Sequence, residues 1–340
     1  MTFFIPSFLL SLFGLFTILG IRKEIALNQA FYLILAVFIF FFTKRFAFFF
    51  RKNQTIFFWL SFFLMVITFF IGLESRGSKR WLNFYVFNLQ PSEILKVFFI
   101  FYFACLLEKG SFYLEKIKIF LKSLFLFLII VFLVFKQPDL GNAVVFSLIF
   151  IALVFYSSIP KKIVFNFIFL SFLFLPLGWF FLKDYQRQRI ISFLNPDFNY
   201  QGASYNMIQS IISVGAGGLL GRGLGFGTQS KLRFLPESHT DFIFASLVEQ
   251  FGFLGGLVIL VLYGILFYLL LKRCLFFLKK KDERENFLVI MGVLVYFFSQ
   301  MLINIGMNMG ILPITGIVLP FLSYGGSALV SSFFLLALIP

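Results

Sequence analysis

The sequence predicts an all-α polytopic membrane protein with about ten transmembrane helices. Three observations lead to this fold class: hydrophobic residues make up 61% of the 340 positions, charged residues make up only 13%, and Phe alone occurs 59 times. A soluble core does not need so much apolar side chain. Apolar runs of about 20 residues match the hydrocarbon layer of a bilayer, which is about 30 Å thick.

The individual spans follow from apolar runs that end at charged residues, Pro or Gly. We interpret the first run as a retained span because no convincing signal-peptide cleavage site follows it. One long loop, about 183–240, joins the seventh and eighth spans, and 1–340 is expected to form a single membrane domain. The expected helices lie near residues 4–21, 27–42, 55–73, 91–107, 119–135, 140–157, 163–182, 242–271, 287–305 and 319–338.

The charge distribution predicts the orientation of these spans. With the N-terminus in the cytosol, the loops "TKRFAFFFRKNQ", "EKGSFYLEKIK", "PKK" and "KRCLFFLKKKDERE" are cytosolic and carry more Lys and Arg than Asp and Glu. The opposite loops are nearly balanced, as the positive-inside rule requires. The net charge of +15 therefore favours contact with anionic membrane lipid. Nucleic acid is a poor alternative because no basic patch leaves the membrane.

Asp241 is the first candidate for chemistry on the outer face. It follows "LPESHT" and precedes a long apolar run, which predicts that Thr240 or His239 caps the eighth span and that Asp241 lies in its first turn. The residue can be read as a helix-start charge only. Against that reading, Glu237 and His239 lie beside it at the border of the lipid, where ionisable groups are costly without a use.

Two further groups of charges flank the third and fourth spans. Glu93 and Lys96 share one helix face in "QPSEILK", which predicts either a structural ion pair or a charged group that lines a polar cavity. Arg80 and Trp81 follow the third span. Trp at this depth is typical of the aromatic belt, but three cations in an outer loop oppose the charge rule and favour binding of an anionic headgroup.

Arg187 and Arg189 in "DYQRQR" repeat this theme at the end of the seventh span. Guanidinium groups suit bidentate contact with phosphate, and snorkelling to the interface is the alternative.

The glycines from Gly215 to Gly227 follow an amphipathic stretch and match neither nucleotide-binding signature. We expect an interfacial helix and a pliable loop there, able to act as a lid. Pro and Gly in "ILPITGIVLPFLSYGG" predict a broken entry to the tenth span.

The motifs together resemble those of the SEDS family of bacterial cell-wall polymerases. They are "GSKRWLNFYVFNLQPSEILK", "KQPDLGNA", "DYQRQRIISFLNPD", "GTQSKLRFLPESHTDFIFASLVEQFGFLGG" and "NIGMNMGILPITGIVLPFLSYGGSALVS", in family order from about residue 74 to the end. Within the family, "QPDLG", "DYQRQR" and "GTQS" look more like RodA, the elongation enzyme, than FtsW, the division enzyme. The Phe-laden N-terminal third departs from the family pattern.

The resemblance implies ten helices and a peptidoglycan glycosyltransferase that polymerises lipid II on the outer face of the bacterial cytoplasmic membrane. It also implies a class B penicillin-binding protein as the cross-linking partner. The family's catalytic carboxylate falls on Asp241, its loop tryptophan on Trp81, and its ion pair on Glu93 and Lys96. The remaining substrate-binding candidates are Arg80, Arg187, Arg189, Glu237, His239, Ser323 and Tyr324.

An inverting transfer from a lipid diphosphate needs a base for the incoming hydroxyl, and we assign that role to Asp241. Arg80, Arg187, Arg189 and Lys96 would balance the diphosphate charge, with a divalent cation such as Mg or Mn as a possible addition. Three alternatives stay open from the residues. They are a lipid II flippase, a division-type polymerase, and a non-catalytic scaffold for the transpeptidase.

Overall fold

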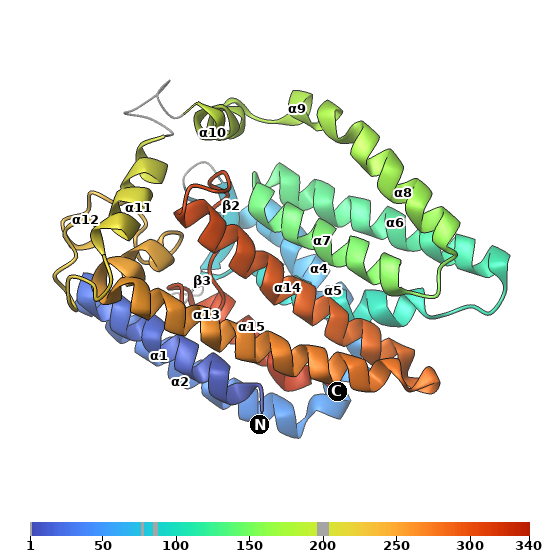
Figure 1. Ribbon diagram of the computed structural model, residues 1–340. Coiled ribbons are helices and arrows are strands. Elements are labelled where there is room, and N and C mark those ends of the chain that lie inside the picture. The colour runs from blue at the N-terminus through green and yellow to red at the C-terminus, as the bar shows by residue number, and fades with distance from the viewer. Residues whose placement is uncertain (1, 76–77, 84–87, 196–203) are drawn as a thin grey trace. The chain divides into compact units, whose positions relative to one another are not determined.

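The computed structural model describes residues 2–75, 78–83, 88–195 and 204–340 and is built almost entirely of helices (Figure 1). Apolar side chains fill the helices on every face, as expected where both neighbours and lipid are apolar. The elements are α1 (Phe4–Ile21), α2 (Lys23–Arg45), α3 (Ala47–Lys52), α4 (Gln54–Ile71), β1 (Leu73–Ser75), β2 (Ser78–Asn83), β3 (Asn88–Leu89), α5 (Pro91–Leu107), α6 (Tyr113–Lys136), α7 (Leu140–Tyr156), α8 (Lys161–Phe174), α9 (Gly178–Phe181), α10 (Asp184–Leu194), α11 (Tyr205–Ala216), α12 (Thr228–Lys231), α13 (Ile243–Leu278), α14 (Arg284–Asn308) and α15 (Gly326–Leu338).

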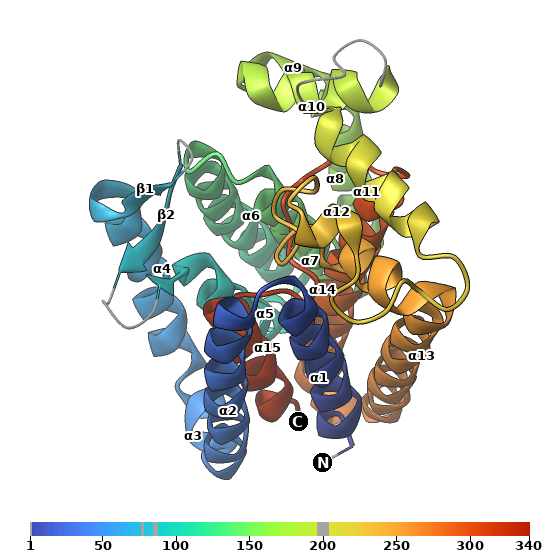
Figure 2. The same cartoon turned by 90° about the vertical axis from the view of Figure 1, so that its left-hand side faces the viewer.

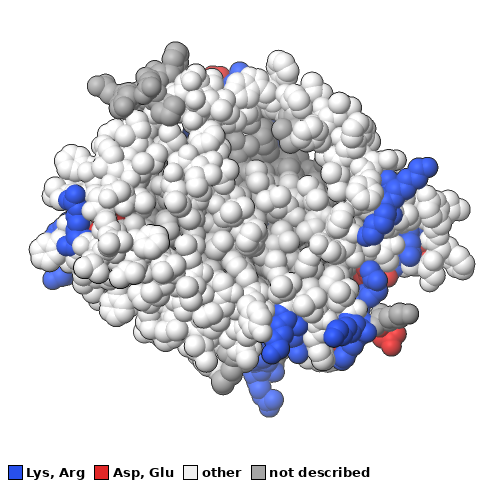
Figure 3. All heavy atoms as spheres, viewed as in Figure 1, with Lys and Arg blue, Asp and Glu red and all other residues white. Residues whose placement is uncertain are grey.

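Several helices are long and apolar enough to cross a membrane. In the described residues, α1, α2, α4, α6, α13 and α14 each have at least 18 residues with high mean hydropathy, and α7 and α15 are shorter apolar helices. The middle of the face shown in Figure 3 carries almost no Lys or Arg, which is what a lipid-facing surface requires. The protein is therefore a multi-pass membrane protein, as the sequence predicts.

Three predicted spans differ from the structure. The seventh, predicted at 163–182, ends as a regular helix at Phe174 and continues through a short 3₁₀ segment, Leu175–Leu177, into α9. Pro176 causes this break because it has no N–H to donate and its ring opposes the preceding turn. The tenth, predicted at 319–338, becomes helical only at Gly326. The irregular stretch before it confirms the predicted broken entry.

The eighth span, predicted as continuous, is broken at Gly252, whose φ is 70° and ψ is −171°. This break leaves backbone groups without helical partners. Phe253 N–H and Leu254 N–H donate to carbonyls of Gly218 and Leu219, at 2.8 and 3.2 Å. The glycine-rich loop is thus hydrogen-bonded into the break at Gly218 and Leu219, and its action as a pliable lid stays a prediction. The helix expected before it is present as α11, and its position at the membrane interface stays a prediction.

A small antiparallel sheet in the order β1-β2-β3 lies between α4 and α5 (Figure 2). Trp81 pairs with Leu73, and Leu82 pairs with Leu89. The sequence did not predict these strands because the stretch is short and polar. The sheet places Arg80 and Trp81 immediately before the charged start of α5.

The chain forms two compact units. The first unit comprises Met1–Tyr32, Phe169–Leu266 and Gln300–Gly325, and the second unit comprises Leu33–Ile168, Phe267–Ser299 and Gly326–Pro340. The first unit holds Asp241 and the second holds the pair Glu93 and Lys96. Each unit is described by itself below.

We predict that Gly252→Ala destabilises the protein. A Cβ there would lie 2.3 Å from both Gly221 N and Leu219 O, which are backbone atoms, in a conformation that L residues rarely adopt. Strained backbone of this kind costs about 1–3 kcal/mol before any steric overlap. Thermal unfolding of the purified protein in detergent measures the loss.

Gly264→Ala is the matched control on the same helix, because a Cβ at Gly264 meets no atom within 4 Å. It should leave the unfolding temperature unchanged or raise it slightly, since Ala favours helix. Equal unfolding temperatures for the two variants would show that the break does not depend on glycine.

Candidate functional site

The turn that carries Asp241 is pinned at both ends by buried apolar side chains. Leu235 and Phe242 are 1% and 2% exposed and belong to one hydrophobic cluster. Between them the chain turns, and Thr240 N–H and Phe242 N–H both donate to Glu237 O at 3.2 Å. Glu237 has a φ of 54°, a strained value that often marks functional segments. Asp241 is half-buried in this turn, two residues before α13 begins.

A free backbone N–H at the start of α13 donates to a side chain of another helix, α14, instead of to the predicted capping residue. Asn308 Oδ1 on α14 accepts a hydrogen bond from Ala245 N–H at 3.0 Å. Thr240 Oγ1 instead donates to Glu237 Oε2 at 3.1 Å. The prediction that Thr240 or His239 caps this helix, with Asp241 in its first turn, is therefore wrong. A side chain distant in sequence competes successfully for the free N–H group.

Two asparagines of α14 hold the backbone of the site. Asn304 Nδ2 and Asn308 Nδ2 donate to Asp241 O at 2.9 and 3.0 Å. Both side chains are fully buried, and Asn304 also donates to Ile317 O at 2.7 Å. Sequence reasoning missed them, although two amides four residues apart in "NIGMN" share a helix face and could have signalled a buried polar contact.

The segment before α15 secures the two preceding carbonyls. Ser323 Oγ donates to Thr240 O at 2.7 Å, and Tyr324 N–H donates to His239 O at 2.8 Å. The rings of Tyr324 and His239 lie 5.5 Å apart. Burial raises the pKa of the Tyr324 phenol, and the neighbouring Tyr32 raises this pKa further. The phenol therefore stays neutral. The carbonyls of His239, Thr240 and Asp241 are thus all held, and the sequence-predicted Ser323 and Tyr324 do join the Asp241 segment.

Arg189 lies on a segment that also approaches Asp241. Its Nη1 donates to Ile314 O at 3.3 Å, and its guanidinium lies over the Tyr185 ring at 5.7 Å. A Cβ placed on Gly316 in the same segment would be 3.5 Å from Asp241 Oδ2. A cation and the carboxylate therefore border one short stretch of chain.

Arg187 faces the other side of α10 and is held by α9. Its Nε and Nη2 donate to Trp179 O and Phe180 O at 3.2 and 3.1 Å, and Asp184 lies 3.8 Å away. The arginine satisfies carbonyls at the end of a helix, where a cation is favourable. It is partly exposed, so its guanidinium still has donors directed to solvent or ligand.

The second unit contains a continuous chain of charged and polar groups. Lys96 Nζ lies 2.7 Å from Glu93 Oε1 and 2.9 Å from Asn142 Oδ1. Asn142 donates to Asp139 Oδ2 at 2.9 Å, and Asp139 pairs with Arg80 at 3.5 Å. The predicted ion pair is confirmed as a contact. Asp139 and Asn142 come from "KQPDLGN", so the sheet and α7 extend the pair into a relay of five groups.

Arg80 and Trp81 have defined surroundings in this relay. Arg80 Nε donates to Gln137 O at 2.9 Å, and a second guanidinium nitrogen donates to Pro138 O. Only 25% of the Arg80 side chain is exposed. Trp81 lies next to it on β2, partly buried. Tyr296, which the sequence did not suggest, donates to Glu93 Oε2 at 3.4 Å and lies under the Lys96 ammonium.

Neither unit offers a metal cage in the residues described. No three His, Cys, Asp or Glu side chains cluster as metal ligands across those parts of the chain. A divalent cation at the site therefore stays a prediction.

We predict that Lys96→Met is strongly destabilising. Glu93 and Lys96 are 2% and 0% exposed, and removal of one partner leaves a buried charge unpaired, at a cost of about 3–5 kcal/mol. Glu93→Gln/Lys96→Met should recover most of that loss because neither residue is then charged. Thermal unfolding in detergent distinguishes the cases, and a double variant no more stable than Lys96→Met contradicts the coupling.

The comparisons with known proteins agree with this geometry. The family model FTSW_RODA_SPOVE, described as cell cycle protein, matches residues 5–340. "Peptidoglycan glycosyltransferase MrdB" of Escherichia coli (strain K12) is 39% identical over 272 residues, which cover 78% of this chain and 71% of the relative. "Probable peptidoglycan glycosyltransferase FtsW" of Pseudoalteromonas translucida is 38% identical over 267 residues, covering 78% and 66%.

Solved structures share the fold. A chain from the structure reported as "Structural coordination of polymerization and crosslinking by a peptidoglycan synthase complex" aligns with a TM-score of 0.82 and 24% identity, covering 99% of this chain and 95% of that one. RodA of Thermus thermophilus aligns with a TM-score of 0.73 and 21% identity, covering 99% and 94%. The helical architecture, the ordered motifs and the matched length lead to one conclusion: the chain belongs to the FtsW/RodA/SpoVE family of cell cycle proteins, the SEDS family.

Proposed function

We propose that this protein is a peptidoglycan glycosyltransferase that polymerises lipid II, with Asp241 as its catalytic base. The name of its 39% identical relative supports the activity. The observation that carries the residue assignment is the turn in which three successive carbonyls, those of His239, Thr240 and Asp241, are each held by a donor from another segment. Such a turn fixes the backbone that carries the Asp241 carboxylate.

The reaction joins an acceptor sugar hydroxyl to the anomeric carbon of a donor sugar that carries a lipid diphosphate. In a single displacement the new C–O bond forms as the bond to the diphosphate breaks, and the configuration inverts without a covalent enzyme intermediate. Asp241 takes the proton of the attacking hydroxyl. The electron pair of the broken bond leaves with the diphosphate, which departs with the lipid.

The position of Asp241 favours the ionised form that a base needs. It precedes the N-terminus of the long helix α13, where the helix dipole is positive. The residue is only half-buried, so desolvation of its carboxylate is incomplete and a substrate hydroxyl can reach it. Thr240 Oγ1 donates to Glu237 Oε2, and we assign Glu237 and His239 to the binding of substrate around the base.

The diphosphate needs positively charged side chains to bind it. The two arginines are more available for this than Lys96. Arg189 is exposed and borders the segment that approaches Asp241, and Arg187 keeps a partly exposed guanidinium. Lys96 is fully buried between Glu93 and Asn142, so its charge is already balanced within the second unit. We therefore assign diphosphate binding first to Arg187 and Arg189, and the positioning of α5 and α7 to Lys96.

The orientation and the partner are part of the same proposal. We infer that the N-terminus is cytosolic and that Asp241 faces outward in the cytoplasmic membrane, because the connectors on the other side are basic. A class B penicillin-binding protein would cross-link the product, in an elongation complex. Support comes from the structural relative whose reported subject is coordinated polymerization and crosslinking. A divalent cation brought by the diphosphate stays a prediction, tested by chelation.

Asp241→Asn should nearly abolish glycan synthesis. A general base contributes about 10² to 10⁴ in rate, and Asn keeps the size of the side chain but cannot accept the proton. The measurement is polymerisation of lipid II by the purified protein, alone and with its transpeptidase partner.

Asp282→Asn is the matched control, because Asp282 is an exposed carboxylate in the connector between α13 and α14. Its activity should equal that of the parent. Near-normal synthesis by Asp241→Asn, with an unchanged unfolding temperature, would remove Asp241 from the role of base.

Arg187→Ala and Arg189→Ala should each cause a graded loss of activity, with an increased KM for lipid II. Both substitutions remove donors that suit the diphosphate. Lys231→Ala is the control, since Lys231 is an exposed cation of the same long loop that lies over the Phe226 ring. An unchanged KM in both arginine variants would make these residues interface anchors only.

A further inference from the structure

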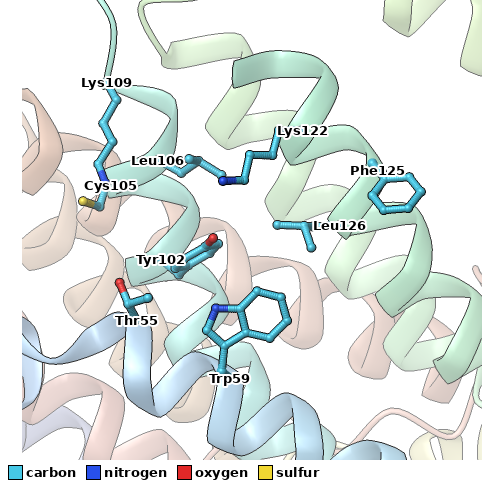
Figure 4. A pocket seen from close by; sticks show the side chains of 9 residues that line it. All are labelled: Thr55, Trp59, Tyr102, Cys105, Leu106, Lys109, Lys122, Phe125 and Leu126. Atoms are coloured by element: carbon cyan, nitrogen blue, oxygen red, sulfur yellow. The ribbon is translucent and has the colours of Figure 1, made fainter. Parts of the chain in front are cut away.

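A cavity of about 530 Å³ lies in the second unit. It is formed where α4 begins, α5 ends and α6 begins (Figure 4). The sheet lies at the opposite ends of α4 and α5, so the cavity and the sheet occupy different ends of these helices. The lining residues are Thr55, Trp59, Tyr102, Cys105, Leu106, Lys109, Lys122, Phe125 and Leu126.

Two lysines direct positive charge at this cavity. In Figure 4 the Lys122 side chain extends from α6 toward α5 and ends beside Leu106, while Lys109 runs down alongside Cys105. In the described parts of the chain no carboxylate lies within 4.0 Å of either ammonium. The Glu285 carboxylate interacts with Cys105 of the lining and accepts a hydrogen bond from Gln54 Nε2 at 3.1 Å. It therefore offsets part of the charge of the two ammonium groups, which have no direct ion-pair partner among the described residues.

The acidic residues closest in sequence are committed elsewhere. Glu108 pairs with Arg284 at 3.3 Å and accepts a hydrogen bond from Ser158 N–H at 3.0 Å. Glu115 accepts from Ser111 N–H at 3.0 Å, at the start of α6. Neither carboxylate is available to balance the two lysines without breaking these contacts.

The rest of the lining is mostly aromatic and apolar, and one of its rings is held by stacking. Tyr102 stacks on Phe58 with ring centroids 4.1 Å apart. Trp59 and Phe125 are 41% and 65% exposed, although they are large apolar side chains. A site with cations at one side and exposed rings at the other suits an amphiphile that has an anionic head and an acyl chain.

We propose that this cavity binds an anionic phospholipid of the cytosolic leaflet, with the headgroup phosphate between Lys109 and Lys122 and an acyl chain against Trp59 and Phe125. The inference rests on the proposed orientation but not on the proposed catalytic residues. A soluble phosphate is the weaker occupant because it would leave the exposed rings unused. The site adds a lipid-binding function to the second unit.

Trp59 serves as the reporter of occupancy. The chain has 3 Trp, so the full-length Trp81→Phe/Trp179→Phe variant fluoresces from Trp59 alone. It is reconstituted in phosphatidylcholine vesicles that contain equal mole fractions of brominated phosphatidylglycerol or brominated phosphatidylcholine, with bromine near the glycerol end of the acyl chain. Bromine quenches only at short range, so stronger quenching by the anionic lipid measures its enrichment at the cavity.

We expect the anionic lipid to quench more strongly, and Lys109→Gln/Lys122→Gln to reduce its relative affinity about fivefold per lysine removed. Lys116→Gln/Lys118→Gln is the matched control. It removes the same charge from α6 at residues that do not line the cavity, and should keep the preference.

Three outcomes overturn the proposal. Equal quenching by the two brominated lipids shows that the cavity does not select charge. An equal loss in the control variant assigns the preference to diffuse surface charge. Loss of the extra quenching on addition of soluble glycerol phosphate identifies a site for a small phosphate compound instead of a lipid. Activity on lipid II is not used as a readout, so failure of this test leaves the proposed function untouched.

Discussion

The candidate site depends on the hydrogen bonds that hold the carbonyls of His239, Thr240 and Asp241 from outside their own segment. In a membrane interior an unpaired backbone group costs several kcal/mol, so every non-helical residue needs a partner. Asn304 and Asn308 supply part of this from α14, and the stretch before α15 supplies the rest. Because the backbone is held, Asp241 has a defined backbone position while its side chain remains only half-buried.

The same constraint explains why the glycine-rich loop is not free. At Gly252 the helix α13 stops accepting and donating its own hydrogen bonds, and the loop enters to satisfy those groups. Arg222 N–H and Gly223 N–H donate to the carbonyls of Glu249 and Gln250 at 2.9 Å, in exchange for the two bonds that the loop accepts. The buried Glu249 carboxylate also accepts from Ser230 N–H and Oγ. The long loop is thus fastened to the helix that follows Asp241.

Charge inside the second unit occurs in two forms with different consequences. In the relay from Glu93 to Arg80, each charged group has a partner within the protein, so the relay orients α5, α7 and the sheet and has little charge to give to a ligand. At the other end of α5, Lys109 and Lys122 face a cavity and have no direct ion-pair partner among the described residues. A cation with a carboxylate partner in the protein serves the structure, whereas a cation without one can bind a ligand. The residue type alone does not reveal which case applies.

The sequence by itself determined the spans, because lipid accepts only long apolar helices and the apolar runs are unambiguous: α1 and α5 have the predicted bounds, and the motif order indicated the family. It also indicated the contact of Glu93 with Lys96, since ionisable groups at a membrane are conspicuous. The tertiary structure alone decided that Asn308 completes the start of α13, that Gly252 breaks this helix, and that Lys96 has Asn142 and Tyr296 as neighbours. These features depend on hydrogen bonds between residues far apart in the chain, and local propensity contains no information about which distant donor will satisfy a free backbone group.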